Sequence, residues 1–136
     1  MLGIRGFMNE NTKFGQFISD LRSRHSMKGQ ELAEKVGISR SYLWQLEHGV
    51  RLNPDADVII RIVKALDLTK EESAALCDVY AMETEQLAPD IAEYIKNCKA
   101  VQKAIRYVLS VNAADEVWKL FIEQLNKLLH NLLAVS

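Results

Sequence analysis

Cationic and hydrogen-bonding side chains are concentrated between Arg22 and Arg51. This stretch contains six cationic and three acidic residues, so it is locally positive although the formal net charge of the whole chain is -1. From Ala81 to Ser136 there are six cationic and seven acidic residues. Clustered Lys and Arg side chains bind phosphates, whereas a near-neutral chain does not bind nucleic acid through bulk charge. We therefore expect any surface that contacts nucleic acid to lie in the first half of the chain.

The chemistry of this stretch depends on a helix over residues 39–47, which Ser39 can cap and Gly49 can end. Along such a helix Leu43 and Leu46 point toward a core. The outer face then carries side chains that hydrogen-bond or stack, namely Arg40, Ser41, Trp44, Gln45 and His48.

Other kinds of site are not indicated. Ser39 and Ser41 have no His and acid arranged for nucleophilic catalysis, and no Gly-rich phosphate loop or paired-carboxylate site stands out. The three histidines are scattered, without partners at metal-ligand spacing. We predict that the protein is not an enzyme, and we predict no catalytic residue, no metal and no cofactor.

Helices must position these side chains, because apolar residues recur at helical spacing almost throughout and no long alternating run predicts a sheet. The fold class is therefore predicted to be all-α. Pro54 is expected at the first position of the fourth helix, and Thr69 with Glu72 forms a capping box for the fifth. Five helices are expected in the first part of the chain, over about 14–25, 29–36, 39–47, 54–66 and 70–82.

The segment from Gly29 to Gly49 resembles the helix-turn-helix of the phage repressor and Cro family, also called the Xre family. The likeness extends from about Phe14 to Tyr80. It implies a five-helix, lambda-repressor-like DNA-binding domain over residues 13–82, after an N-terminal arm over 1–12 and before a C-terminal helical segment over 83–136. The family pattern is met at Leu32, Ala33, Gly37, Ile38, Ser39, Leu43, Leu46, Glu47 and Gly49.

The resemblance also implies roles for individual residues. In the family the second helix of the motif lies in the major groove, so residues 39–47 would read bases. Arg40 can pair with guanine, Gln45 with adenine, and Ser41 with either base. Trp44 either packs on a thymine methyl or a sugar, or leans on a neighbouring helix. Phosphate contacts are expected from Lys28, Gly29, Gln30, His48 and Arg51.

Two further positions are compared with the family. Arg22 and Glu47 match positions that form a partly buried ion pair, so we expect them to join the first and third helices. The start of the second helix departs from the pattern, because the family usually has Ser or Thr followed by a Gln that clamps a phosphate. This sequence has Lys28 and Gly29 there, and Gln30 stands one residue late. Lys28 can substitute for the clamp as a point charge.

The C-terminal third is predicted to contain helices from Pro89 to Leu109, with a break near Asn97 and Cys98, and a last helix capped by Asn112. The last helix carries a wide apolar stripe that must be covered. Either it folds back onto the first domain or it pairs with a second subunit, and two-fold symmetric reading of DNA favours the pair. The residues assigned to this interface are Trp118, Phe121, Ile122, Leu125, Leu128, Leu129 and Leu132.

Two functions of different classes fit these observations. The first is a sequence-specific transcriptional regulator, a repressor that occupies a pseudo-palindromic operator on double-stranded DNA as a homodimer. The second is an antitoxin-like or adaptor module with weak DNA binding, in which the C-terminal segment is the working surface. A protein or peptide effector could act at the same segment. Neither a signal peptide nor a membrane span is recognisable, so we expect a cytoplasmic protein that does not contact a membrane.

Overall fold

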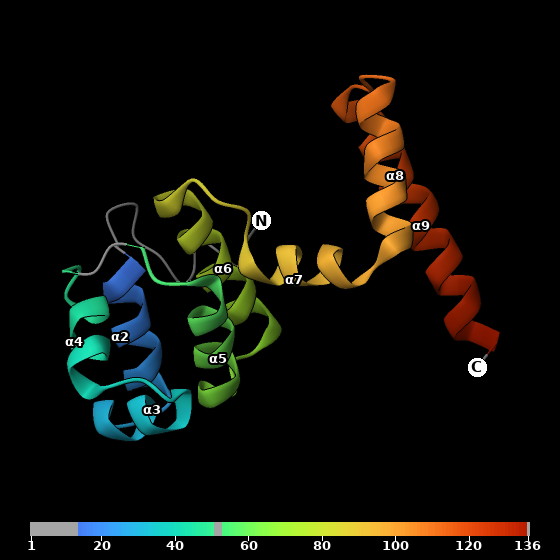
Figure 1. Ribbon diagram of the computed structural model, residues 1–136. Coiled ribbons are helices and arrows are strands. Elements are labelled where there is room, and N and C mark those ends of the chain that lie inside the picture. Colours follow the sequence, from blue (N-terminus) through green and yellow to red (C-terminus); the bar gives the residue numbers. More distant parts are fainter. Residues whose placement is uncertain (1–13, 51–52, 136) are drawn as a thin grey trace. The chain divides into compact units, whose positions relative to one another are not determined.

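The computed structural model describes residues 14–50 and 53–135, and within these ranges it is built from α-helices without strands. This confirms the all-α prediction. The chain divides into two compact units between Tyr94 and Ile95. The helices in chain order (Figure 1) are α2 (Phe14–Arg24), α3 (Gly29–Val36), α4 (Arg40–Glu47), α5 (Ala56–Leu66), α6 (Lys70–Thr84), α7 (Pro89–Asn97), α8 (Lys99–Ser110) and α9 (Asp115–Val135).

The first unit is closed around one apolar core. α2 packs against α4 and α6, and α3 packs against α4 and α5. Tyr80 of α6 lies edge-on to Phe14 of α2, with 5.7 Å between the ring centroids. The expected inner face of α2 is buried, because residues three and four apart lie on one side of a helix; its members are Phe14, Phe17, Ile18 and Leu21.

Several helix ends agree with the signals in the sequence. Gly37 follows α3 with a left-handed backbone (φ 78°), and its N–H donates back to α3 carbonyls. The Ser39 hydroxyl caps α4 by accepting the backbone N–H of Tyr42 at 3.0 Å. Thr69 and Glu72 form the predicted capping box at the start of α6. Local hydrogen bonding thus fixes where these helices begin and end.

Two helix starts differ from the predictions. α5 begins at Ala56 rather than Pro54, because the residue before it has an extended backbone and the Pro54 carbonyl accepts the Tyr80 hydroxyl at 2.9 Å. α9 begins at Asp115, and Asn112 does not cap it but has a left-handed φ of 47°. In both cases the residue that resembles a start signal lies in the loop before the helix.

The core of the first unit extends past residue 82, where the sequence suggests a domain boundary. Ala88 belongs to the buried cluster, and Pro89 at the start of α7 is buried as well. The division at residue 82 stays a prediction, and the proposed arm over residues 1–12 lies outside the described residues.

The second unit is built differently. The predicted helix break is present, since α7 ends at Asn97 and α8 begins at Lys99. α8 and α9 form a helical hairpin (Figure 1), and none of the described side chains from Ile95 to Ala134 is buried. No helix in the described ranges has both the length and the apolar character that a membrane span requires.

Candidate nucleic-acid interface

α4 is fixed to the first unit by one face only. Leu43 and Leu46 are each 1% exposed and belong to the core. Arg40, Ser41 and Trp44 are exposed on the other side of the helix. The outer face of α4 is therefore open to a ligand while its inner face is held in place.

A bidentate ion pair joins α4 to α2. Arg22 donates through Nε and Nη2 to the two carboxylate oxygens of Glu47, at 2.6 and 3.1 Å. Its third nitrogen, Nη1, donates to the carbonyl of Met27 at 3.0 Å. The hydrogen bond to Glu47 raises the pKa of Arg22 and outweighs the opposing effect of burial. One guanidinium thus ties together α2, the loop before α3, and α4.

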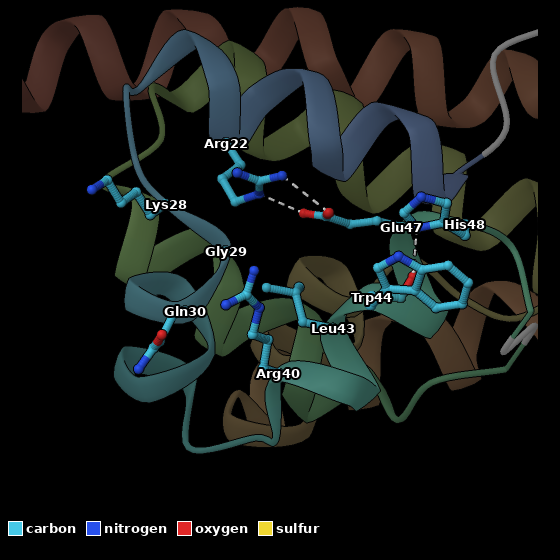
Figure 2. A pocket seen from close by; sticks show the side chains of 9 residues that line it. All are labelled: Arg22, Lys28, Gly29, Gln30, Arg40, Leu43, Trp44, Glu47 and His48. Carbon is cyan, nitrogen blue, oxygen red and sulfur yellow. Dashed lines mark hydrogen bonds and ion pairs between the residues drawn. The ribbon is translucent and has the colours of Figure 1, made fainter.

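A hollow of about 410 Å³ lies between the start of α3 and the outer side of α4. Figure 2 shows the Arg40 side chain extending from α4 toward the start of α3. Among the described residues no ion pair involves Lys28 or Arg40, so both cationic groups are available to a ligand. The residues that line the hollow are Arg22, Lys28, Gly29, Gln30, Arg40, Leu43, Trp44, Glu47 and His48.

The N-terminus of α3 opens into this hollow. Lys28 occupies its cap position without a side-chain cap bond, and the first N–H groups of a helix have no partner inside the helix. The Gln30 side chain donates to Glu34 of the same helix at 3.3 Å. The backbone at Gly29, the Lys28 ammonium and the Gln30 amide thus all border the hollow, and groups of this kind attract anions.

Trp44 and His48 form a stacked pair on the outer face of α4. Their ring centroids lie 4.1 Å apart at an interplanar angle of 18°. His48 donates from Nδ1 to the Trp44 carbonyl at 2.9 Å, because a carbonyl oxygen can only accept. This leaves Nε2 of His48 as the ring nitrogen that can meet a ligand. The indole of Trp44 remains 54% exposed, so the stack does not remove it from the surface.

Ser41 and Gln45 lie on α4 but do not line the hollow. Each is about 100° further round the helix than Arg40 or Trp44, respectively. Ser41 is exposed and Gln45 is half-buried. The structure thus brings Arg40 and Trp44 to the hollow and leaves the other two residues beside it. Arg51, the remaining predicted phosphate contact, lies outside the described residues.

Three residues that position the site give no local signal in the sequence. A Cβ at Gly15 would lie 2.1 Å from the carbonyl oxygen of Leu46, so α2 can approach the end of α4 this closely only through a glycine. Arg61 of α5 donates to the last carbonyl of α3. Glu83 accepts the first N–H of α2 at 2.6 Å. Each contact joins residues far apart in the chain, which helical periodicity cannot identify.

The residues assigned to a subunit interface all lie on α9, in the second unit. Trp118 is half-buried and lies edge-on to Phe121, with 5.9 Å between the ring centroids. The other assigned residues are between 37% exposed at Leu125 and 60% exposed at Leu132. What covers this stripe stays a prediction.

Residues 15–79 match a protein-family model described as a helix-turn-helix domain. Two curated relatives, from two strains of Mycobacterium tuberculosis, are each named an uncharacterized HTH-type transcriptional regulator and are 42% identical to this chain over 57 residues. The match covers 42% of this chain, and it spans only 40% of the length of each relative. A solved structure titled SinR protein/SinI protein complex is similar over 83% of this chain and 94% of that chain, with 19% identity and a TM-score of 0.43.

Proposed function

We propose that the chain is a helix-turn-helix protein of the Xre type that binds double-stranded DNA and regulates transcription, because residues 15–79 match a helix-turn-helix domain and two relatives are named HTH-type transcriptional regulators. In this proposal α4 lies in the major groove and reads a specific sequence. The protein acts as a repressor, because a dimer bound to a pseudo-palindromic operator occupies DNA that the transcription machinery needs.

The observation that carries the proposal is the hollow between α3 and α4. It combines two cationic groups, on Lys28 and Arg40, with the N-terminus of α3, and both features attract phosphate. A hollow used by an uncharged ligand would have no need for such groups. Lys28 and Gly29 take the part that a clamping Gln has in the family pattern, with a point charge and an open backbone in place of an amide.

Base reading is assigned to the outer face of α4. Arg40 can form two hydrogen bonds to guanine, and such a contact discriminates against the wrong base by roughly 1–3 kcal/mol. Ser41 and Gln45 lie on the adjacent strip of the helix, where they can meet the next base pairs. The Trp44–His48 stack offers an apolar ring for a thymine methyl and one ring nitrogen for a phosphate.

A dimer follows from the way such motifs read DNA. Two recognition helices reach two half-sites only if they are about 34–36 Å apart, one turn of DNA. The exposed apolar stripe on α9 supports an assembly of this kind, because large apolar patches mark partner surfaces.

The test is selection of bound DNA from a random double-stranded library at near-physiological salt, where non-specific binding is weak. We expect an inverted repeat with half-sites about one helical turn apart. On that site, Arg40→Ala and Gln45→Ala should abolish discrimination at individual base pairs. Lys28→Ala should weaken all sequences alike and lower the salt slope by about 0.9.

Lys64→Ala is the matched control for these variants. It removes one positive charge from an exposed position on α5, away from the hollow. If Arg40→Ala and Lys64→Ala bind the selected site equally well, α4 is not the reading helix. If no sequence is enriched and a stoichiometric protein partner co-purifies, the protein is an antitoxin-like or adaptor module instead.

A further inference from the structure

The hairpin of α8 and α9 carries an apolar cavity that is open to solvent on one side, and none of the side chains that line it is buried. About 290 Å³ lies between the two helices. The cavity lining includes Val101, Ile105 and Val108 of α8 and Val117, Trp118 and Phe121 of α9.

α9 is also too long for the helix beside it. It has 21 residues and α8 has 12, which correspond to about 32 Å and 18 Å. In the antiparallel hairpin (Figure 1), α8 therefore accompanies α9 only to about residue 126. Beyond that point Leu128, Leu129 and Leu132 are 56%, 45% and 60% exposed. The second unit thus has an unfilled apolar cavity at one end and uncovered leucines at the other.

The apolar positions of the α9 stripe are arranged symmetrically along the sequence about Leu125. Residues equally far from this centre are both large and apolar: Trp118 and Leu132, Phe121 and Leu129, Ile122 and Leu128. Trp118, Leu125 and Leu132 are seven residues apart, which is the repeat of helices that pair along a seam. A pattern with this symmetry matches itself when a second copy runs antiparallel, as an isologous interface requires.

Charges do not oppose this pairing. Between Trp118 and Leu132 the charged residues are Lys119, Glu123 and Lys127. At 100° per residue, Glu123 and Lys127 lie about 160° from Leu125 and Lys119 lies about 120° from it, on the far side of the helix. The residues nearest the centre on either flank are Gln124 and Asn126, which are uncharged. A second copy can therefore cover the stripe without burying a charge.

The area available decides how many helices take part. Seven half-exposed large side chains offer roughly 50 Å² each, so two α9 helices alone would bury roughly 700 Å². Stable interfaces bury roughly 1,200–2,000 Å². The difference requires the apolar side of α8, which the leucines of a second copy reach if they enter the cavity between α8 and α9.

We propose that two copies of this chain pair through antiparallel α9 helices, with the two-fold axis at Leu125. Leu128, Leu129 and Leu132 of each copy fill the α8–α9 cavity of the other, and the four helices form one bundle. The arrangement rests on the homodimer proposed above and adds its direction and register.

Cysteine cross-linking tests the direction. In a Cys98→Ser background, where the remaining Cys77 is fully buried, Phe121→Cys and Leu129→Cys are made separately. In the antiparallel pair, position 121 of one subunit faces position 129 of the other. The two equivalent positions, 121 and 121 or 129 and 129, are about 12 Å apart along the helix axis. A disulfide requires Cα atoms about 4.4–6.8 Å apart. Of these two variants, neither should form a disulfide-linked dimer by itself, and a mixture of the two should form one. A third variant, Leu125→Cys, should form a disulfide-linked dimer by itself, because position 125 lies on the two-fold axis.

Charge substitution at the axis is the second measurement, which does not depend on disulfide geometry. Leu125→Lys and Leu125→Glu should each be monomeric by sedimentation, since position 125 meets its own copy. Mixing them should restore a dimer. Circular dichroism of each variant verifies that the helices are retained.

Three results would overturn the arrangement. Cross-linking of Phe121→Cys with itself would show a parallel pair. If a mixture of Leu125→Lys and Leu125→Glu formed no dimer, the two-fold axis would not lie at Leu125. If the unsubstituted protein were monomeric at micromolar concentration, the homodimer itself would be wrong. The DNA selection experiment then tests separately whether the protein reads a base sequence.

Discussion

The two units contain similar amphipathic helices but differ in what covers them. In the first unit, apolar side chains from α2 to α6 are buried in one cluster. In the second, none of the described side chains is buried. Ile59 of the 11-residue α5 is fully inaccessible, whereas Tyr107 of the 12-residue α8 is 70% exposed. Helical periodicity therefore identifies an apolar face without identifying the surface that covers it.

The number of helices explains the difference. Helices α2 to α6 surround a core from several directions, whereas two helices alone share one line of contact. Isolated helices shorter than about 12–15 residues are marginal in water, and the apolar stripe of α9 is left exposed by the one helix beside it. This exposed stripe is the physical reason to expect a second copy there.

Matched leucine-to-alanine substitutions should give the largest effect and test the comparison directly. Leu21 of α2 is 0% exposed, and Leu128 of α9 is 56% exposed. Leu21→Ala removes packed atoms and leaves a cavity, so it should lower the free energy of unfolding by about 2–5 kcal/mol. Leu128→Ala should change it by less than about 0.5 kcal/mol in the monomer and raise the dissociation constant of the dimer instead.

The two tryptophans make this measurement separable, because Trp44 lies in the first unit and Trp118 in the second. In a Trp118→Phe background, denaturation followed by fluorescence reports on the first unit and on the effect of Leu21→Ala. In a Trp44→Phe background it reports on the second unit and on the effect of Leu128→Ala. Equal losses from Leu21→Ala and Leu128→Ala at low protein concentration would contradict the contrast between a closed and an open unit.

A smaller loss of unfolding free energy is expected from Gly15→Ala, at the close contact between α2 and α4 of the first unit. In Gly15→Ala the added methyl would lie 2.1 Å from the Leu46 carbonyl oxygen, so α2 and α4 must move apart. Overpacking of this kind costs about 1–3 kcal/mol, and DNA affinity should fall with it because α4 is displaced. Gly29→Ala is the control for stability, since its added methyl would meet no atom closer than 4.0 Å. Equal stability of the two variants would show that α2 and α4 are not held at this distance.

The sequence predicts local features of this molecule and misses distant ones. The Gly37 turn and the Ser39 cap follow from residues within one or two turns of each other, and the structure confirms them. The helix-turn-helix pattern follows from the spacing of residues along one continuous segment, and residues 15–79 match a helix-turn-helix domain. The contacts of Gly15 and Glu83 join positions more than thirty and sixty residues apart. Nothing in the periodicity of either segment encodes such a contact.

The candidate site was predictable to the same extent. Helical geometry places Arg40 and Trp44 on one exposed face, and the structure brings both to the hollow. The same geometry groups Ser41 and Gln45 with them. The hollow, however, forms on the side of α4 that faces the start of α3, and Ser41 and Gln45 do not line it. The position of one helix against another is set by the core, not by the spacing of polar residues.

The smallest expected effect concerns pH and is confined to the closed unit. Burial alone would raise the pKa of Glu72, but hydrogen bonds from Thr69 and His25 hold it below its usual value. A carboxyl with a lowered pKa in the folded state adds stability above its unfolded pKa of about 4.3, and that stability is lost as the pH falls through the folded value. Glu72→Gln should cost about 0.5–1 kcal/mol at pH 7 and flatten the acid side of the stability curve.

Glu71→Gln is the matched control for this prediction, because Glu71 is the exposed neighbour in the same first turn of α6. Unfolding free energies of both variants are compared with the parent in denaturant from pH 3 to pH 7, again with Trp44 as the probe. Because the hydrogen bonds of Glu72 join the end of α2 to α6, the second unit should show no matching change in a Trp44→Phe background. If Glu71→Gln flattened the acid limb as much as Glu72→Gln does, the pH dependence would reflect the charge of α6 rather than this contact between helices.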